Sequence, residues 1–188
     1  MQTLEQQMSF YAAYHQDARN KATHFVGVPM IIFGLFIALG WARIEAGGVT
    51  LSAATLLAAV VLVWYFLLDV PLALAMLVVT AVLVYLGQAI ADLGAAPGWA
   101  WFALLFVGGW ILQLVGHVFE GRKPALADNL FQIFVAPIFL AAEVFFALGY
   151  KPELHERVLQ LSRAQSVESS ISLERTSYKS DASGSRSV

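Results

Sequence analysis

Five long apolar runs dominate the chain, with short polar segments between them. They cover residues 25–42, 51–68, 71–91, 98–119 and 130–149. Because a helix needs about 20 predominantly apolar residues to cross a bilayer, each run predicts a transmembrane helix. The pattern therefore predicts an all-α fold: a polytopic membrane helical bundle of about five transmembrane helices.

The second and third runs are separated only by Asp69-Val70-Pro71. Proline and the residue before it disfavour a continuous helix, so the break predicts a tight helical hairpin. A single unbroken helix of some 40 residues would reach about 60 Å, roughly twice the thickness of the hydrocarbon core. We therefore favour the hairpin over one kinked helix.

The two ends of the chain have patterns of their own. Leu4, Met8, Tyr11 and His15 recur at helical spacing, which predicts an N-terminal amphipathic helix at the membrane surface. After the last run, a polar helix is expected to about residue 163. We expect residues 1–163 to form a single integral membrane domain and residues 164–188 to form a Ser-rich disordered tail.

Composition narrows the class of protein. Hydrophobic residues make up 59% of the chain, charged residues 13%, and the mean hydropathy is +0.70, so an ordinary soluble domain is excluded. The net charge is only −2, which gives no basic field for nucleic acid, and no nucleic-acid motif occurs. The absence of cysteine excludes disulfides and thiolate metal sites.

The predicted spans also set which segments can meet. Four crossings separate the N-terminal segment from the segment after the fourth run, so the two fall on one side of the membrane. Basic residues near the spans are more numerous on this side, which carries Arg19, Lys21, Arg122 and Lys123, than on the other, which carries Arg43, Lys151 and Arg157. The positive-inside rule therefore places this side in the cytoplasm. The Ala/Gly/Leu-rich runs fit a bacterial inner membrane.

Histidines mark the candidate site. His117 ends the fourth apolar run, and ionisable groups at membrane depth usually face a bundle interior and mark a working site. His15 and His24 are nine residues apart, on opposite faces of an unbroken helix, so they share a ligand only if the helix breaks between them.

Polar neighbours extend this site. Asn20 lies four residues before His24, and Gln113 lies four residues before His117, so each pair shares a helix face. His117 and Glu120 form an H-x-x-E pair that could converge on one ion. These residues permit a non-haem iron site of histidines and a carboxylate. Hydrogen bonding without metal is the other interpretation.

Other polar residues have structural interpretations. Arg122 and Lys123 are candidates to bind an anionic substrate head group, or else lipid phosphate. Asp128 and Asn129 favour a helix N-cap, and Glu143 favours an interhelical hydrogen bond. His155 follows the last run and is excluded as a ligand.

Several blocks of the chain resemble the DUF962 family of membrane proteins, which includes a yeast 2-hydroxy fatty acid dioxygenase. The likeness extends from about residue 10 to about residue 150. The blocks are Phe10-Tyr11-Ala12-Ala13-Tyr14-His15, Asn20-x3-His24-x3-Val28-Pro29, Gly109-Trp110-Ile111-x-Gln113-x-Val115-Gly116-His117 and Phe119-Glu120-x-Arg122-Lys123-Pro124-Ala125-Leu126-x-Asp128-Asn129-Leu130.

The resemblance implies an Fe(II)-dependent dioxygenase that converts a long-chain 2-hydroxy fatty acid and dioxygen into a fatty acid one carbon shorter. It implies His15, His24 and His117 as iron ligands. We expect Asn20 and Glu120 to be catalytic residues. Gln113, together with the basic pair at 122 and 123, would then contact the substrate. Membrane lipid surrounds such an enzyme, and the sequence is compatible with a homo-oligomer.

One departure from the family pattern keeps the ligand set open. The pattern carries a second histidine directly after the first, and this chain has Gln16 there. Glu120 is a candidate replacement, and Asp17 is a weaker one. A zinc-dependent membrane lipid hydrolase that uses the same three histidines remains an alternative, as does a non-enzymatic lipid-binding protein.

Overall fold

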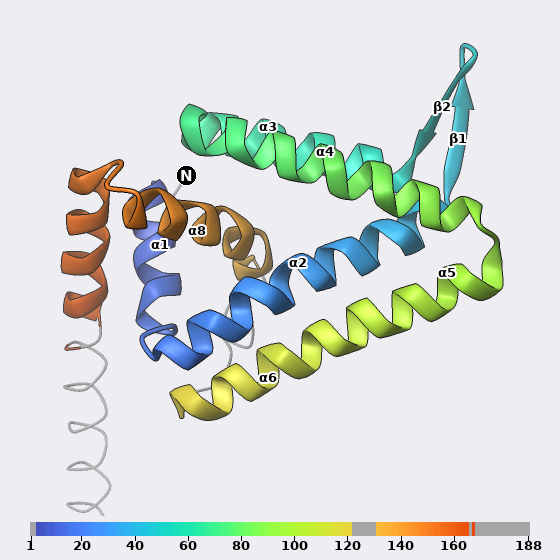
Figure 1. Cartoon of the computed structure of the whole chain (residues 1–188). Coiled ribbons are helices and arrows are strands. Elements are labelled where there is room, and N and C mark those ends of the chain that lie inside the picture. The colour runs from blue at the N-terminus through green and yellow to red at the C-terminus, as the bar shows by residue number, and fades with distance from the viewer. Residues whose placement is uncertain (1–2, 122–130, 166, 168–188) are drawn as a thin grey trace, which may run out of the picture.

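In a computed structural model, the chain forms a bundle of helices with one small β-hairpin (Figure 1). The structure describes residues 3–121, 131–165 and 167. In chain order the elements are α1 (Leu4–Ala13), α2 (Ala18–Gly40), β1 (Arg43–Ala46), β2 (Val49–Ser52), α3 (Ala53–Leu68), α4 (Val70–Asp92), α5 (Ala95–Phe102), the π-helical η1 (Ala103–Val107), α6 (Gly108–Glu120) and α8 (Gln132–Ala147). A further helix covers residues 152–165. The predicted all-α bundle is confirmed, and the antiparallel hairpin of β1 and β2 is an addition to it.

All five apolar runs are mainly helical in their described residues, but the helices differ in length. Three helical segments are long and apolar enough to cross a membrane: Ala18–Gly40, Val70–Asp92 and Ala95–Glu120. The helices α3 and α8 have 16 residues each, or about 24 Å at 1.5 Å per residue. That length falls short of a hydrocarbon core of about 30 Å.

The predicted break between α3 and α4 is confirmed, and it occupies a single residue. Asp69 has an extended backbone that ends α3 and begins α4, and its side chain accepts a hydrogen bond from the Leu72 N–H at 3.0 Å. Pro71 then falls in the first turn of α4, where its missing N–H leaves no bond unmade. The two helices lie side by side as an antiparallel pair (Figure 1).

The fourth run is one continuous helical segment that changes its winding. Residues 103–107 form a π-helical turn between α5 and α6. Here Gly34 of α2 approaches so closely that a Cβ on it would lie 2.9 Å from the backbone nitrogen of Phe106. The wider turn therefore coincides with a close approach of α2.

The N-terminal helix packs against protein on its apolar face. Leu4, Met8 and Tyr11 are buried, and they belong to one core cluster with residues of α8 such as Phe139. Thr3 caps the helix in a capping box. The expected N-terminal helix therefore exists, but its apolar positions pack against protein and not against the membrane surface.

The chain after α8 returns to the end of the bundle that carries the histidines. Lys151 forms an ion pair with Asp69 at the α3–α4 turn (2.7 Å), and Arg157 pairs with Glu5 of α1 (3.1 Å). The expectation that Lys151 and Arg157 lie opposite the histidines is therefore wrong. The reason is that the chain after α8 packs against the α3–α4 turn and α1, both of which lie at the histidine end (Figure 1).

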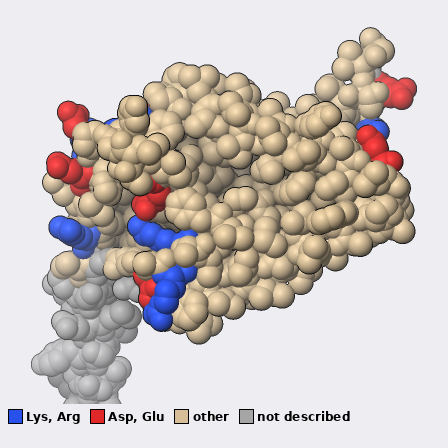
Figure 2. Space-filling view, in the orientation of Figure 1, with Lys and Arg blue, Asp and Glu red and all other residues tan. Residues whose placement is uncertain are grey.

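Charge on the surface follows the same division. Figure 2 shows charged side chains gathered at the end that carries α1 and around the β-hairpin, with a broad uncharged surface between them. This surface fits a bilayer belt around the long helices. Most of the predicted Ser-rich tail, and the segment with Asp128 and Asn129, lie outside the described residues.

Candidate metal centre

Small residues bring α2 and α6 into the close contact that builds the site. A Cβ on Gly27 would lie 2.9 Å from the Gly109 carbonyl oxygen, and a Cβ on Gly116 would lie 2.4 Å from Oδ1 of Asn20. Glycines at such crossings let membrane helices approach closely. The Cβ position of Gly116 is also 3.3 Å from Nδ1 of His24, so this contact places His24 beside the last turn of α6.

A break in the N-terminal segment supplies the third histidine. The helix α1 ends at Ala13, and Asp17 caps the start of α2 by accepting a hydrogen bond from the Arg19 N–H at 2.8 Å. His15 lies between the two helices. The break that the sequence requires is therefore present, and it turns His15 back toward His24.

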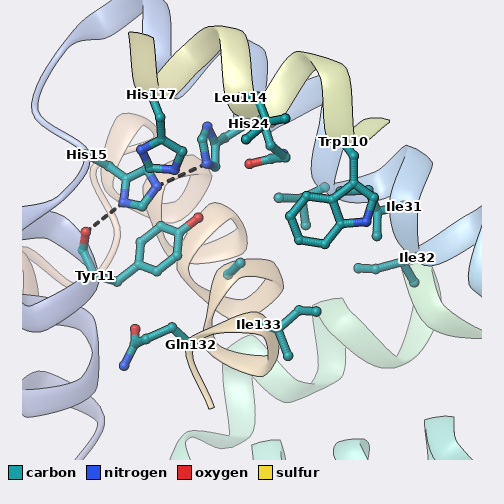
Figure 3. A pocket seen from close by; sticks show the side chains of 13 residues that line it. Tyr11, His15, His24, Ile31, Ile32, Trp110, Leu114, His117, Gln132 and Ile133 are labelled. Atoms are coloured by element: carbon teal, nitrogen blue, oxygen red, sulfur yellow. Dashed lines mark hydrogen bonds between the residues drawn. The ribbon is translucent and has the colours of Figure 1, made fainter. Parts of the chain in front are cut away.

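The three histidines from three segments face one another (Figure 3). The ring centroids are 4.4 Å apart for His15 and His24, and 5.1 Å from each of these to His117. Each residue offers one nitrogen within 4.8 Å of the others, and all three side chains are buried. This spacing lets three imidazoles hold one metal ion.

Hydrogen bonds fix which nitrogens are available. Nδ1 of His15 lies 2.8 Å from the Tyr11 carbonyl oxygen, and Nδ1 of His24 lies 2.9 Å from the Asn20 carbonyl oxygen. A carbonyl oxygen only accepts, so each Nδ1 carries the proton and donates it. The two Nε2 atoms are then lone-pair donors, and they face each other at 3.0 Å.

The lone pairs of the two Nε2 atoms repel each other unless a cation lies beside them. A proton bound to one of the histidines could be that cation, but protonation is disfavoured. Burial lowers the pKa of His15 to about 3, and the neighbouring His24 acts in the same direction. His15 therefore stays neutral at physiological pH, which is the form that binds metal. The donor set thus fits a resident metal ion.

Glu120 anchors the His15 loop. Its carboxylate accepts hydrogen bonds from the backbone N–H groups of Gln16 and Asp17, both at 2.9 Å, and from Nδ2 of Asn20 at 2.9 Å. Charge-assisted bonds of this kind are the stronger ones. Its oxygens thus already have three N–H partners, and neither Glu120 nor Asp17 belongs to the cluster of ligand atoms.

Several buried polar atoms around the histidines have no hydrogen-bond partner in the described part of the chain. They include Oδ1 of Asn20, Nε2 of Gln113, Nδ1 of His117 and Oε1 of Gln132. Such atoms are rare in folded proteins because each costs about 1–3 kcal/mol. Their concentration beside the histidines indicates a site that takes up a ligand.

A cavity of about 80 Å³ opens from the histidines between α2, α6 and α8. Tyr11 and Gln132 line its polar end with the histidines, although the sequence pattern singled out neither for chemistry. The position of Tyr11 one turn before His15 was the available signal for it. The apolar wall includes Val28, Ile31, Ile32, Trp110, Leu114 and Ile133 (Figure 3).

The remaining candidates lie elsewhere. Glu143 forms an ion pair with Lys21 at 2.9 Å, which agrees with the expected interhelical hydrogen bond. His155 stacks on Phe146 and is not in the cluster, as expected. Arg122 and Lys123 lie outside the described residues.

Comparison with known proteins places the chain in a family. The model of the family described as "2-hydroxy-palmitic acid dioxygenase Mpo1-like" matches residues 1–148. The 2-hydroxy-palmitic acid dioxygenase MPO1 of Saccharomyces cerevisiae is 36% identical over 153 residues, which cover 80% of this chain and 84% of that protein. No solved structure matches the chain. The chain therefore belongs to the 2-hydroxy-palmitic acid dioxygenase Mpo1-like family.

Proposed function

We propose that this protein is a non-haem Fe(II)-dependent dioxygenase that shortens 2-hydroxy fatty acids by one carbon. The observation that carries the proposal is the buried group of His15, His24 and His117 at the polar end of an apolar cavity. The yeast relative, a dioxygenase of 2-hydroxy-palmitic acid by name, supports the reaction and the substrate class.

The reaction balances without a further reductant. A 2-hydroxy acid and dioxygen give the acid one carbon shorter, carbon dioxide and water; the bond between C1 and C2 breaks, and C2 is oxidised to a carboxyl group. His15, His24 and His117 would hold the iron, which when bound supplies the redox chemistry that dioxygen requires and a Lewis acid for the hydroxy acid.

The protein's own residues would hold and orient the components. Glu120 keeps the His15 loop in place through its three N–H partners. Asn20 joins this anchor to His24, because its carbonyl oxygen accepts the proton of the histidine Nδ1. Gln113 would place its free amide N–H on the polar end of the substrate.

The cavity is large enough for only the first part of a fatty acid. One water needs about 10–15 Å³ by this measure, so a cavity of about 80 Å³ holds roughly five to eight groups of that size. That is enough for the polar end and the first methylene groups. The rest of a long chain would extend past the apolar wall into the bilayer, which explains why the reaction occurs in a membrane.

We also propose that the histidines lie at the cytoplasmic side of a bacterial inner membrane. In the structure Lys151 and Arg157 join Arg19 and Lys21 at this end, while Arg43 lies at the end with the β-hairpin. The positive-inside rule therefore supports the orientation more strongly than the sequence count did.

The deciding experiment loads purified protein with Fe(II) without oxygen, adds 2-hydroxyhexadecanoic acid, and then admits oxygen. We expect pentadecanoic acid by mass spectrometry, in amounts that follow oxygen uptake. Zinc-loaded protein is the matched control and is expected to be inactive. Absence of the shortened acid, or oxygen-independent lipid hydrolysis with zinc, would contradict the proposal and favour the hydrolase.

A further inference from the structure

Tyr11 has a buried phenol whose hydroxyl has no partner in the protein as described. The side chain is 4% exposed, and its ring stacks on His15 with centroids 3.9 Å apart and planes 6° apart. Phe139 packs against it at 4.6 Å. Figure 3 shows that the hydroxyl extends past the histidine cluster into the cavity. The ring is thus fixed while its polar tip faces open space.

Tyr65 shows what a structural tyrosine looks like in the same protein. It is 1% exposed, and its hydroxyl donates a hydrogen bond to the Phe134 carbonyl oxygen at 2.6 Å. Buried tyrosine hydroxyls usually find such a partner. Core packing therefore explains Tyr65 completely, but it does not explain the hydroxyl of Tyr11.

The polar atoms around Tyr11 indicate the chemistry of the missing partner. A phenol is protonated at physiological pH, so the Tyr11 hydroxyl can donate a hydrogen bond. Nε2 of Gln113, which lines the same cavity, is a second donor without a partner. A ligand that pairs with these two donors must offer acceptor atoms, and the apolar wall calls for a hydrocarbon attached to them.

We propose that Tyr11 is a substrate-positioning residue whose hydroxyl donates a hydrogen bond to the polar end, carboxylate or 2-hydroxyl, of a bound 2-hydroxy fatty acid. This inference rests on the proposed function. Stacking on His15 holds the phenol at a fixed place relative to the histidines. The hydrogen bond would therefore set where the polar end of the substrate lies within the cavity.

The test compares Tyr11→Phe with Tyr65→Phe. Equilibrium dialysis measures the Kd of 2-hydroxyhexadecanoic acid on metal-loaded protein without oxygen, and steady-state assays give KM and kcat. For Tyr11→Phe we expect Kd and KM to rise about tenfold, kcat to stay within about twofold, and the melting temperature to be unchanged. Tyr65→Phe should lower the melting temperature and leave Kd unchanged.

The inference is overturned if Tyr11→Phe binds the acid as tightly as the wild type, or if it loses stability as Tyr65→Phe does. Its failure differs from failure of the proposed function. Suppose that the wild-type protein binds the acid, that Tyr11→Phe weakens this binding, and that the acid is never shortened. This result would refute the dioxygenase and keep the role of Tyr11 in positioning the acid. Wild-type protein that does not bind the acid would overturn both.

Discussion

Several glycines pack α2 against η1 and α6, and two of them, Gly34 and Gly116, have very different neighbours. At Gly34 the neighbour is the π-helical segment, where Phe106 crowds the position. At Gly116 the nearest atoms are Oγ1 of Thr23, Oδ1 of Asn20 and Nδ1 of His24. Close approach is thus a general packing device here, and the side chains beside it decide whether a site results.

The two ends of the bundle also differ in whether their polar groups have partners. At the β-hairpin end, Arg43 forms an ion pair with Asp92, and both side chains are at least a third exposed. At the other end, Nδ1 of His117 and Oδ1 of Asn20 are buried without a partner. Paired charges in water need no further explanation, whereas buried unpartnered groups do.

The largest effect is expected from His117→Ala. Changes to residues that only support metal ligands typically cost 10–100-fold in affinity, so loss of a ligand should exceed about 100-fold and abolish turnover. Elemental analysis of purified protein measures the bound metal. His155→Ala is the control, because His155 stacks on Phe146 outside the cluster. Full metal content in His117→Ala would remove His117 from the ligand set.

Gly116→Ala and Gly34→Ala test whether helix packing can be disturbed without weakening metal binding. The new Cβ would lie 2.2 Å from Oγ1 of Thr23 in the first and 2.9 Å from the Phe106 nitrogen in the second. Both should lower the free energy of unfolding by about 1–3 kcal/mol. Only Gly116→Ala should also weaken metal binding, by at least about tenfold, measured by metal titration. Equal metal affinity in the two variants would break the comparison.

Glu120→Gln tests the loop anchor. An amide has one acceptor oxygen for the three N–H donors that the carboxylate serves, so at least one charged hydrogen bond, worth about 1.5–3 kcal/mol, is lost. We expect faster hydrogen exchange at Gln16 and Asp17 and metal affinity lower by about tenfold. Glu45→Gln on the exposed hairpin is the control. Unchanged exchange would show that Glu120 does not hold the loop.

The smallest effect is expected from Asp92→Asn, which breaks the ion pair with Arg43 at the far end. An exposed pair contributes about 0–1 kcal/mol, so the free energy of unfolding should fall by no more than that. Metal content and turnover should not change. A loss of metal in Asp92→Asn would show that the two ends of the bundle are coupled.

Much of the architecture was predictable because it depends on local pattern. The length of the apolar runs predicts the helices, and the proline after Asp69 predicts the hairpin of α3 and α4. Geometry along one helix also shows that His15 and His24 need a break between them, and Asp17 provides its far edge. Each of these inferences uses only residues that are near one another in sequence.

The chain by itself thus determined the helices, the class of protein and the three histidines that lie together. The tertiary structure decided what these residues face. It gave Glu120 the backbone N–H groups of a loop more than 100 residues away, left the hydroxyl of Tyr11 free, and returned the chain after α8 to the histidine end. The physical reason is that periodicity fixes which face of a helix is apolar, whereas the neighbour of each polar atom depends on how the helices pack.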